Sequence, residues 1–66
     1  MAEITIPPLH LPEDPALIPC YTAAASIYVA GVQACVASGE PPKLIQACIN
    51  GHYITYLLAL HECDIA

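Results

Sequence analysis

The four cysteines of this 66-residue chain are the residues whose type and spacing are most suited to chemistry. Cys35 and Cys48 lie about equally far, on opposite sides, from residues 38–42, and the same is true of Cys20 and Cys63. Residues 38–42 read Ser-Gly-Glu-Pro-Pro, a sequence typical of a turn between helices. If two helices fold back on each other at this turn, each cysteine pair lies at one level of the hairpin.

The sequence is compatible with two states of these cysteines, reduced thiols and disulfides. The N-terminal residues Met1, Ala2 and Glu3 show neither the basic and apolar regions of a secretory signal nor an Arg-rich transit pattern, so we expect a cytosolic origin. Thiols stay reduced in the cytosol, and a free cysteine packs as a small hydrophobic residue. We therefore expect reduced core cysteines. The alternative is a pair of disulfides, because the mirrored spacing loosely resembles that of oxidised hairpin proteins of the intermembrane space.

Metal binding and catalysis have little support in the sequence. No CxxC motif occurs, and His61 and Cys63 are only two residues apart, so they would point away from each other on a helix. Cys48 and His52 stand one helical turn apart, as a nucleophile and its base can. However, no orienting group, oxyanion loop or phosphate-binding loop accompanies them. We expect no metal, no cofactor and no enzymatic activity, with His52 packed on a helix face and hydrogen-bonded to a neighbour.

Local signals define the elements that would position these residues. Asp14 before Pro15 is a helix start, with an acidic cap followed by proline in the first turn. The N-terminal segment contains three prolines, which disfavour a helix and favour extended backbone. We predict an all-α fold, an antiparallel two-helix hairpin with an extended Pro-rich N-terminal arm. The arm is residues 1–13 and the hairpin is residues 14–66, with helices at about 15–38 and 41–63.

The composition predicts association with other chains. Hydrophobic residues make up 58% of the chain and charged residues 11%, too few to cover a small monomer with polar surface. We expect the arm to lie along a neighbouring subunit and the tyrosines to act as interface anchors. The predicted interface residues are Ile4, Ile6, Leu9, Leu11, Tyr21, Tyr28, Tyr53, Tyr56, Leu57 and Leu60.

Charge and hydropathy restrict the kinds of partner. The net charge is −5, Lys43 is the single basic residue other than histidine, and arginine is absent, so we expect no sequence-specific nucleic-acid binding. Two uncharged runs, residues 17–39 and 44–61, are about long enough to span a bilayer. Their polar residues and the lack of flanking basic clusters argue against a membrane hairpin, which remains an alternative.

Two segments of the chain resemble a known family. Residues 13–25 (EDPALIPCYTAAA) resemble the acidic, Ala-rich helix start of gp6-like head–tail connector proteins of tailed bacteriophages. Residues 42–47 and 51–53 resemble that family's second core helix, and His61-Glu62 stands where the family tends to have Arg-Glu. The resemblance implies a structural subunit of a homo-oligomeric ring below the portal. Such a ring extends the DNA channel and contacts portal and tail-side proteins in a virion made in the host cytoplasm.

The sequence therefore leads to two functional hypotheses. The first is the head–tail connector ring implied by the resemblance. The alternative is an accessory helical-hairpin subunit of a membrane or organellar complex, either stapled by disulfides or spanning the bilayer. The mass of the purified assembly distinguishes these hypotheses, because only the first requires a defined large ring.

Overall fold

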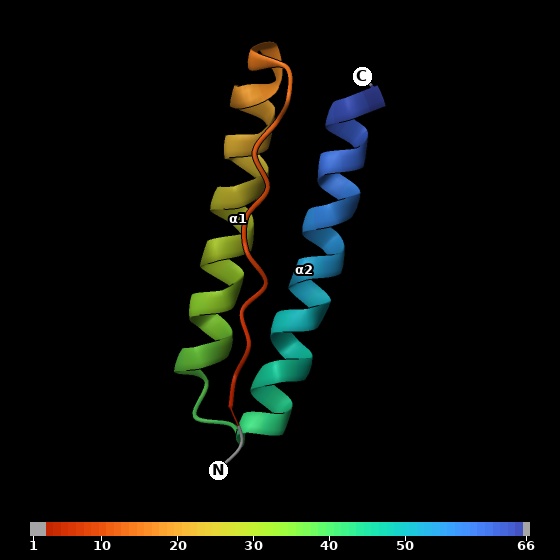
Figure 1. Ribbon diagram of the computed structural model, residues 1–66. Coiled ribbons are helices and arrows are strands. Elements are labelled where there is room, and N and C mark those ends of the chain that lie inside the picture. Colours follow the sequence, from red (N-terminus) through yellow and green to blue (C-terminus); the bar gives the residue numbers. More distant parts are fainter. Residues whose placement is uncertain (1–2, 66) are drawn as a thin grey trace.

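Two long antiparallel helices form the fold. The computed structural model describes residues 3–65, and among these it contains the short 3₁₀ helix η1 (Pro15–Leu17), α1 (Ile18–Ala37), α2 (Pro42–Ile65) and no strand. The helices lie side by side, and the N-terminal segment runs along the hairpin beside them (Figure 1). The predicted all-α hairpin is confirmed.

Asp14 caps a helix as predicted, but the α-helix itself begins later than the predicted residue. The Asp14 carboxylate accepts a hydrogen bond of 2.9 Å from the Ala16 amide, as an N-cap does. This cap opens η1, and α1 begins only at Ile18, three residues after the predicted start. Pro19 lies in the first turn of α1. Amide groups in the first turn have no hydrogen-bond acceptor within the helix, so a proline without an amide hydrogen is tolerated there.

The turn between the helices has the predicted chemistry. Gly39 has φ of +77°, a left-handed conformation that glycine adopts without strain. The Ser38 hydroxyl donates to the Cys35 carbonyl at 2.7 Å and accepts from the Glu40 amide at 3.3 Å. α2 begins one residue later than predicted, at Pro42, and ends at Ile65, two residues beyond the predicted end.

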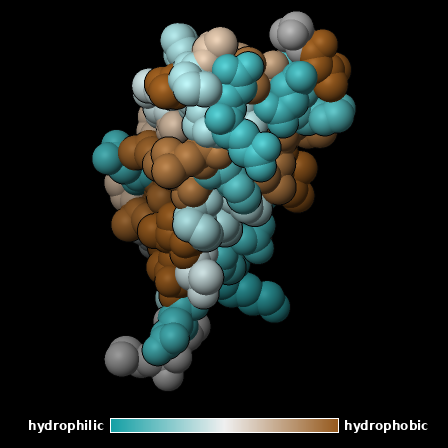
Figure 2. Space-filling view, turned by 45° about the horizontal axis from the view of Figure 1, so that its top comes forward, coloured by the Kyte–Doolittle hydropathy of each residue, from teal (hydrophilic) through white to brown (hydrophobic). Residues whose placement is uncertain are grey.

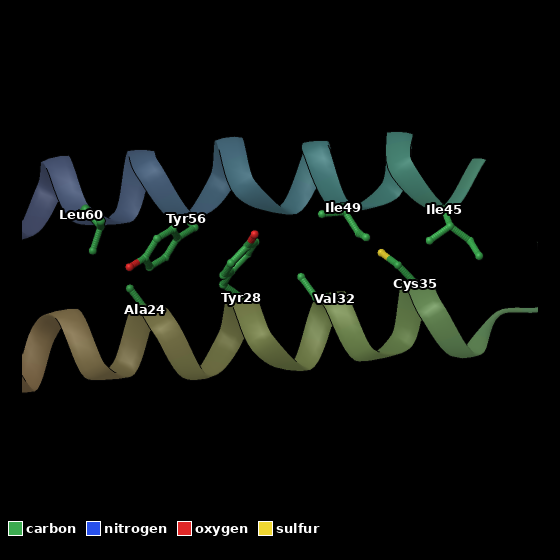
Figure 3. Packing of buried hydrophobic residues seen from close by; sticks show 8 residues of the cluster. All are labelled: Ala24, Tyr28, Val32, Cys35, Ile45, Ile49, Tyr56 and Leu60. Carbon is green, nitrogen blue, oxygen red and sulfur yellow. The ribbon is translucent and has the colours of Figure 1, made fainter. Parts of the chain in front are cut away.

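A narrow apolar seam joins the two helices. Figure 3 shows four side chains from α1 facing four from α2. Their spacing of three, four or seven residues places them on one face of each helix. Ile49 is completely buried in the seam. The core cluster consists of Ala24, Tyr28, Val32, Cys35, Ile45, Ile49, Tyr56 and Leu60.

The N-terminal arm lies against its own hairpin. Residues 3–12 have no regular secondary structure, and Thr5 forms two hydrogen bonds with the Gln46 side chain, donating at 2.7 Å and accepting at 2.9 Å. Tyr28 donates to the Pro7 carbonyl at 3.2 Å. We expected the arm on a neighbouring subunit, but here polar side chains of both helices hold it. The Gln46 amide satisfies both backbone groups of Thr5, much as an adjacent strand would.

Candidate functional site

Both cysteine pairs form disulfides at the levels that the sequence predicts. Cys35–Cys48, the turn-end disulfide, has a Cα–Cα distance of 5.8 Å, and Cys20–Cys63, the open-end disulfide, has one of 6.0 Å. The expectation of reduced core cysteines is wrong for this structure, because all four are paired. Only Cys35 and Cys63 are buried, whereas Cys20 and Cys48 are exposed. Each disulfide therefore joins a core position on one helix to a surface position on the other.

His52 lies beside the turn-end disulfide. One imidazole nitrogen and the sulfur atoms of Cys35 and Cys48 lie within 4.8 Å of one another. His52 and Cys48 are one turn apart on α2, while Cys35 comes from α1, so the hairpin brings the three together. Ligand spacing within one helix does not reveal this group, because Cys35 lies on the other helix. Because its sulfur is bonded to Cys35, Cys48 is not available as a nucleophile with His52 as its base.

Gly31 of α1 makes room for the imidazole. A Cβ atom built on Gly31 would lie 2.5 Å from His52 Nδ1 and 2.8 Å from its Cγ, well inside van der Waals contact. The His52 ring therefore rests on the bare backbone of the facing helix. His52 lies on a helix face, with this glycine and the disulfide as neighbours. Its side chain is nevertheless exposed, and the expected hydrogen bond to a neighbour is not formed within residues 3–65.

Aromatic side chains fill the middle of the molecule. Tyr28 and Tyr56 stack with ring centroids 4.9 Å apart and planes inclined by 16°. His10 of the arm donates its backbone amide to the Tyr56 hydroxyl at 3.0 Å, and its Nε2 forms a 3.0 Å hydrogen bond with the Tyr53 hydroxyl. The phenol groups thus satisfy arm polar groups while the rings pack in the core.

Two tyrosines have raised pKa values. At the open end, Tyr21 donates to Asp64 at 2.7 Å, and this hydrogen bond is the main reason why its pKa lies above the usual 10. Burial raises the pKa of Tyr28, and the neighbouring tyrosines add to this effect. In both cases the neutral phenol is the favoured form in the folded chain.

The predicted interface residues divide into three groups. Tyr28, Tyr56 and Leu60 are buried in the chain's own core, so they are not available to a partner of this hairpin. Tyr21 and Tyr53 are partly buried and hydrogen-bonded within the chain. The remaining predicted residues are exposed: Ile4, Ile6, Leu9, Leu11 and Leu57.

Exposed apolar side chains extend well beyond the predicted set. The chain exposes 4718 Å², whereas a compact monomer of its mass would expose about 4000 Å². Figure 2 shows a broad hydrophobic area on one face. An open groove of about 740 Å³ lies between the arm and α1, with Leu9, Leu11, Ile18 and Val29 in its walls. Exposed residues that the sequence reading did not select are Ile18, Ile27, Val29, Val36, Leu44, Ile54, Leu58 and Ile65.

One segment has the general properties of a membrane span. Within the described residues, only the helical stretch Pro15–Ala37 is long and apolar enough, with a mean hydropathy of 1.4. This assignment depends on length and composition alone, and the core helices of soluble proteins and signal sequences meet the same criteria. The second predicted run, residues 44–61, does not reach this level, so the structure does not strengthen the bilayer-spanning alternative.

The fold and its crosslinks define a class, a two-helix hairpin closed by two disulfides between its helices. Comparisons of the chain with protein-family models, with curated proteins and with solved structures find no match. The resemblance to phage connectors therefore remains a hypothesis.

Proposed function

We propose that this chain is a noncatalytic accessory subunit that packs its apolar surface against other subunits of a larger complex in an oxidising compartment. The observation that carries this proposal is the pair of disulfides, Cys20–Cys63 and Cys35–Cys48. Structural disulfides persist in oxidising compartments, whereas cytosolic thiols are kept reduced. The disulfides therefore favour the stapled accessory subunit over a particle assembled in a reducing cytoplasm.

Small size explains why such a subunit needs its crosslinks. Within residues 3–65 the core has nine buried hydrophobic residues, and a hairpin offers a single internal interface. Domains of this length usually need disulfides, a metal or partner subunits for stability. The two disulfides hold both ends of the helix pair, so the hairpin can present apolar residues outward without collapsing around them.

The groove between the arm and α1 is the surface that we assign to the partner. Its lining on α1 includes the small residues Ala25, Ser26 and Ala30, which let another helix approach closely. Its lining is mainly apolar and, among the residues that the structure describes, includes no acidic or basic side chain other than His10. An apolar helix of a second protein is the occupant that matches this lining.

A phage head–tail connector ring is the second candidate. The same excess of apolar surface supports it, because ring subunits bury large areas against identical neighbours. The two proposals differ in what they require. A ring requires a closed homo-oligomer of defined copy number, whereas an accessory subunit requires oxidised cysteines and a different protein as partner.

Site-specific photo-crosslinking in the native cell tests the proposal. A photoreactive amino acid at Val29, in the groove, should give discrete adducts with another protein, and one at Asn50, which is exposed on α2, should give few. Mass spectrometry of freshly alkylated protein should show four hydrogens fewer than the reduced chain. Free thiols together with a closed homo-oligomer would instead support the connector ring.

A further inference from the structure

The turn-end disulfide differs from the open-end disulfide in having a third metal-binding side chain within reach. A sulfur pair and an imidazole nitrogen within 4.8 Å of one another are close to the spacing of ligands around one metal ion. The open-end disulfide belongs to no such group of three among residues 3–65. This makes it an internal control for any chemistry of the turn end.

We propose that reduction of Cys35–Cys48 creates a Zn²⁺ site, with the two cysteine thiolates and the His52 imidazole as protein ligands. Two sulfurs and one imidazole form a donor set that suits zinc, and three protein ligands leave the fourth position open to water or another molecule. The site exists only in the reduced hairpin, since the disulfide bond occupies both sulfurs. The proposal does not depend on which partner the subunit has.

The hairpin geometry suits this donor set. With Zn–S bonds of about 2.3 Å and tetrahedral angles, the two sulfurs would lie about 3.8 Å apart. The 5.8 Å Cα–Cα distance allows this separation after small side-chain rotations. His52 follows Cys48 by four residues, so both project from one face of α2 toward Cys35. Gly31 leaves the space in which the ring reaches across to the facing helix.

The redox step is balanced with a dithiol as reductant. A dithiol thiolate attacks the sulfur of the exposed Cys48, and the buried Cys35 leaves as a thiolate. The second thiol of the reductant then displaces Cys48 and closes the reductant's own disulfide. Two electrons and two protons have passed to the chain, and Zn²⁺ binding releases these two protons from the thiols.

Cobalt binding to the full-length chain tests the site. A phosphine reductant is used, because it becomes a phosphine oxide as it supplies the electrons and does not compete for the metal as a dithiol would. The reduced chain should bind one Co²⁺ with a sulfur-to-metal charge-transfer band, and Zn²⁺ should displace it. The oxidised chain should show no such band.

Paired variants separate this site from binding by an unfolded chain. Cys20→Ala/Cys63→Ala should retain the cobalt band, and Cys35→Ala/Cys48→Ala should lose it. His52→Ala should weaken Zn²⁺ binding at least tenfold. His61 is an exposed histidine on the same helix, so His61→Ala should leave binding unchanged.

Two glycines provide a finer test. Gly31→Ala should weaken binding by displacing the imidazole. Gly51→Ala should not, because the added carbon has no atom within 4 Å apart from its chain neighbours and the nearby backbone of its own helix. Circular dichroism of each reduced variant monitors helix content. The proposal is overturned if the reduced chain binds no cobalt, if His61→Ala weakens binding as much as His52→Ala, or if the two cysteine pairs behave alike.

Discussion

The two ends of the hairpin carry the same kind of crosslink in different surroundings. Both disulfides join a buried cysteine to an exposed one, at Cα–Cα distances of 6.0 and 5.8 Å. The open-end disulfide spans a sequence separation of 43, and the turn-end disulfide spans only 13. His52 stands beside the turn-end disulfide alone. We therefore expect the open end to contribute more to stability, while the turn end has the groups for chemistry.

The largest expected effect is the loss of the open-end disulfide. Loop-closure entropy predicts a loss of about 4 kcal/mol for Cys20→Ala/Cys63→Ala and about 3 kcal/mol for Cys35→Ala/Cys48→Ala. The free energy of unfolding is measured by urea titration of each oxidised variant, followed by circular dichroism. A larger loss at the turn end would show that local packing outweighs loop length in this hairpin.

A smaller effect is expected from the polar contacts at each end. Gln46→Ala, near the turn, removes both hydrogen bonds to Thr5 and should cost roughly 1–2 kcal/mol. Tyr21→Phe removes the open-end bond to Asp64, which lies in water, and should cost less. Hydrogen exchange of the Thr5 amide reports on the arm and should accelerate only in Gln46→Ala. Equal acceleration in both variants would mean that the arm detaches as one unit from the whole hairpin.

Alkaline pH should weaken the hairpin through its tyrosines. The folded-state pKa values of Tyr21 and Tyr28 lie above 10, so their contribution is complete below pH 10 and is lost as the pH rises through the folded-state values. Thermal unfolding is measured from about pH 9 to about pH 11. Tyr28→Phe should flatten this dependence more than Tyr21→Phe, because the Tyr28 ring is buried. The opposite order would place the sensitive group at the open end.

The smallest effect is expected from the two helical glycines near the turn end. The new methyl group of Gly51→Ala meets no atom within 4 Å apart from its chain neighbours and the nearby backbone of α2, so it should stabilise α2 by up to about 1 kcal/mol. Gly31→Ala gains the same helix propensity, but its new methyl group must displace His52, so the net change should be near zero or unfavourable. Thermal unfolding of the oxidised variants measures both. An equal gain in both variants would show that the imidazole moves at no cost.

The parts of the fold that were predicted correctly depend on local signals. Asp14 as a cap, Gly39 past a helix end and the prolines of the turn act within a few residues of themselves. Helix periodicity and the turn then determine which residues share a level of the hairpin. The pairing of Cys20 with Cys63 and of Cys35 with Cys48 follows because the two cysteines of each pair are about equally far from the turn.

The sequence by itself determined the all-α hairpin, its turn and the levels of its cysteines, because each follows from backbone propensities and helix geometry. Only the tertiary structure decided three further features. The arm lies on its own hairpin because side chains from both helices bind its backbone. The sulfurs are bonded because the helices approach closely enough at both levels. His52 reaches the turn-end disulfide because Gly31, distant in sequence, leaves room for its ring on the facing helix.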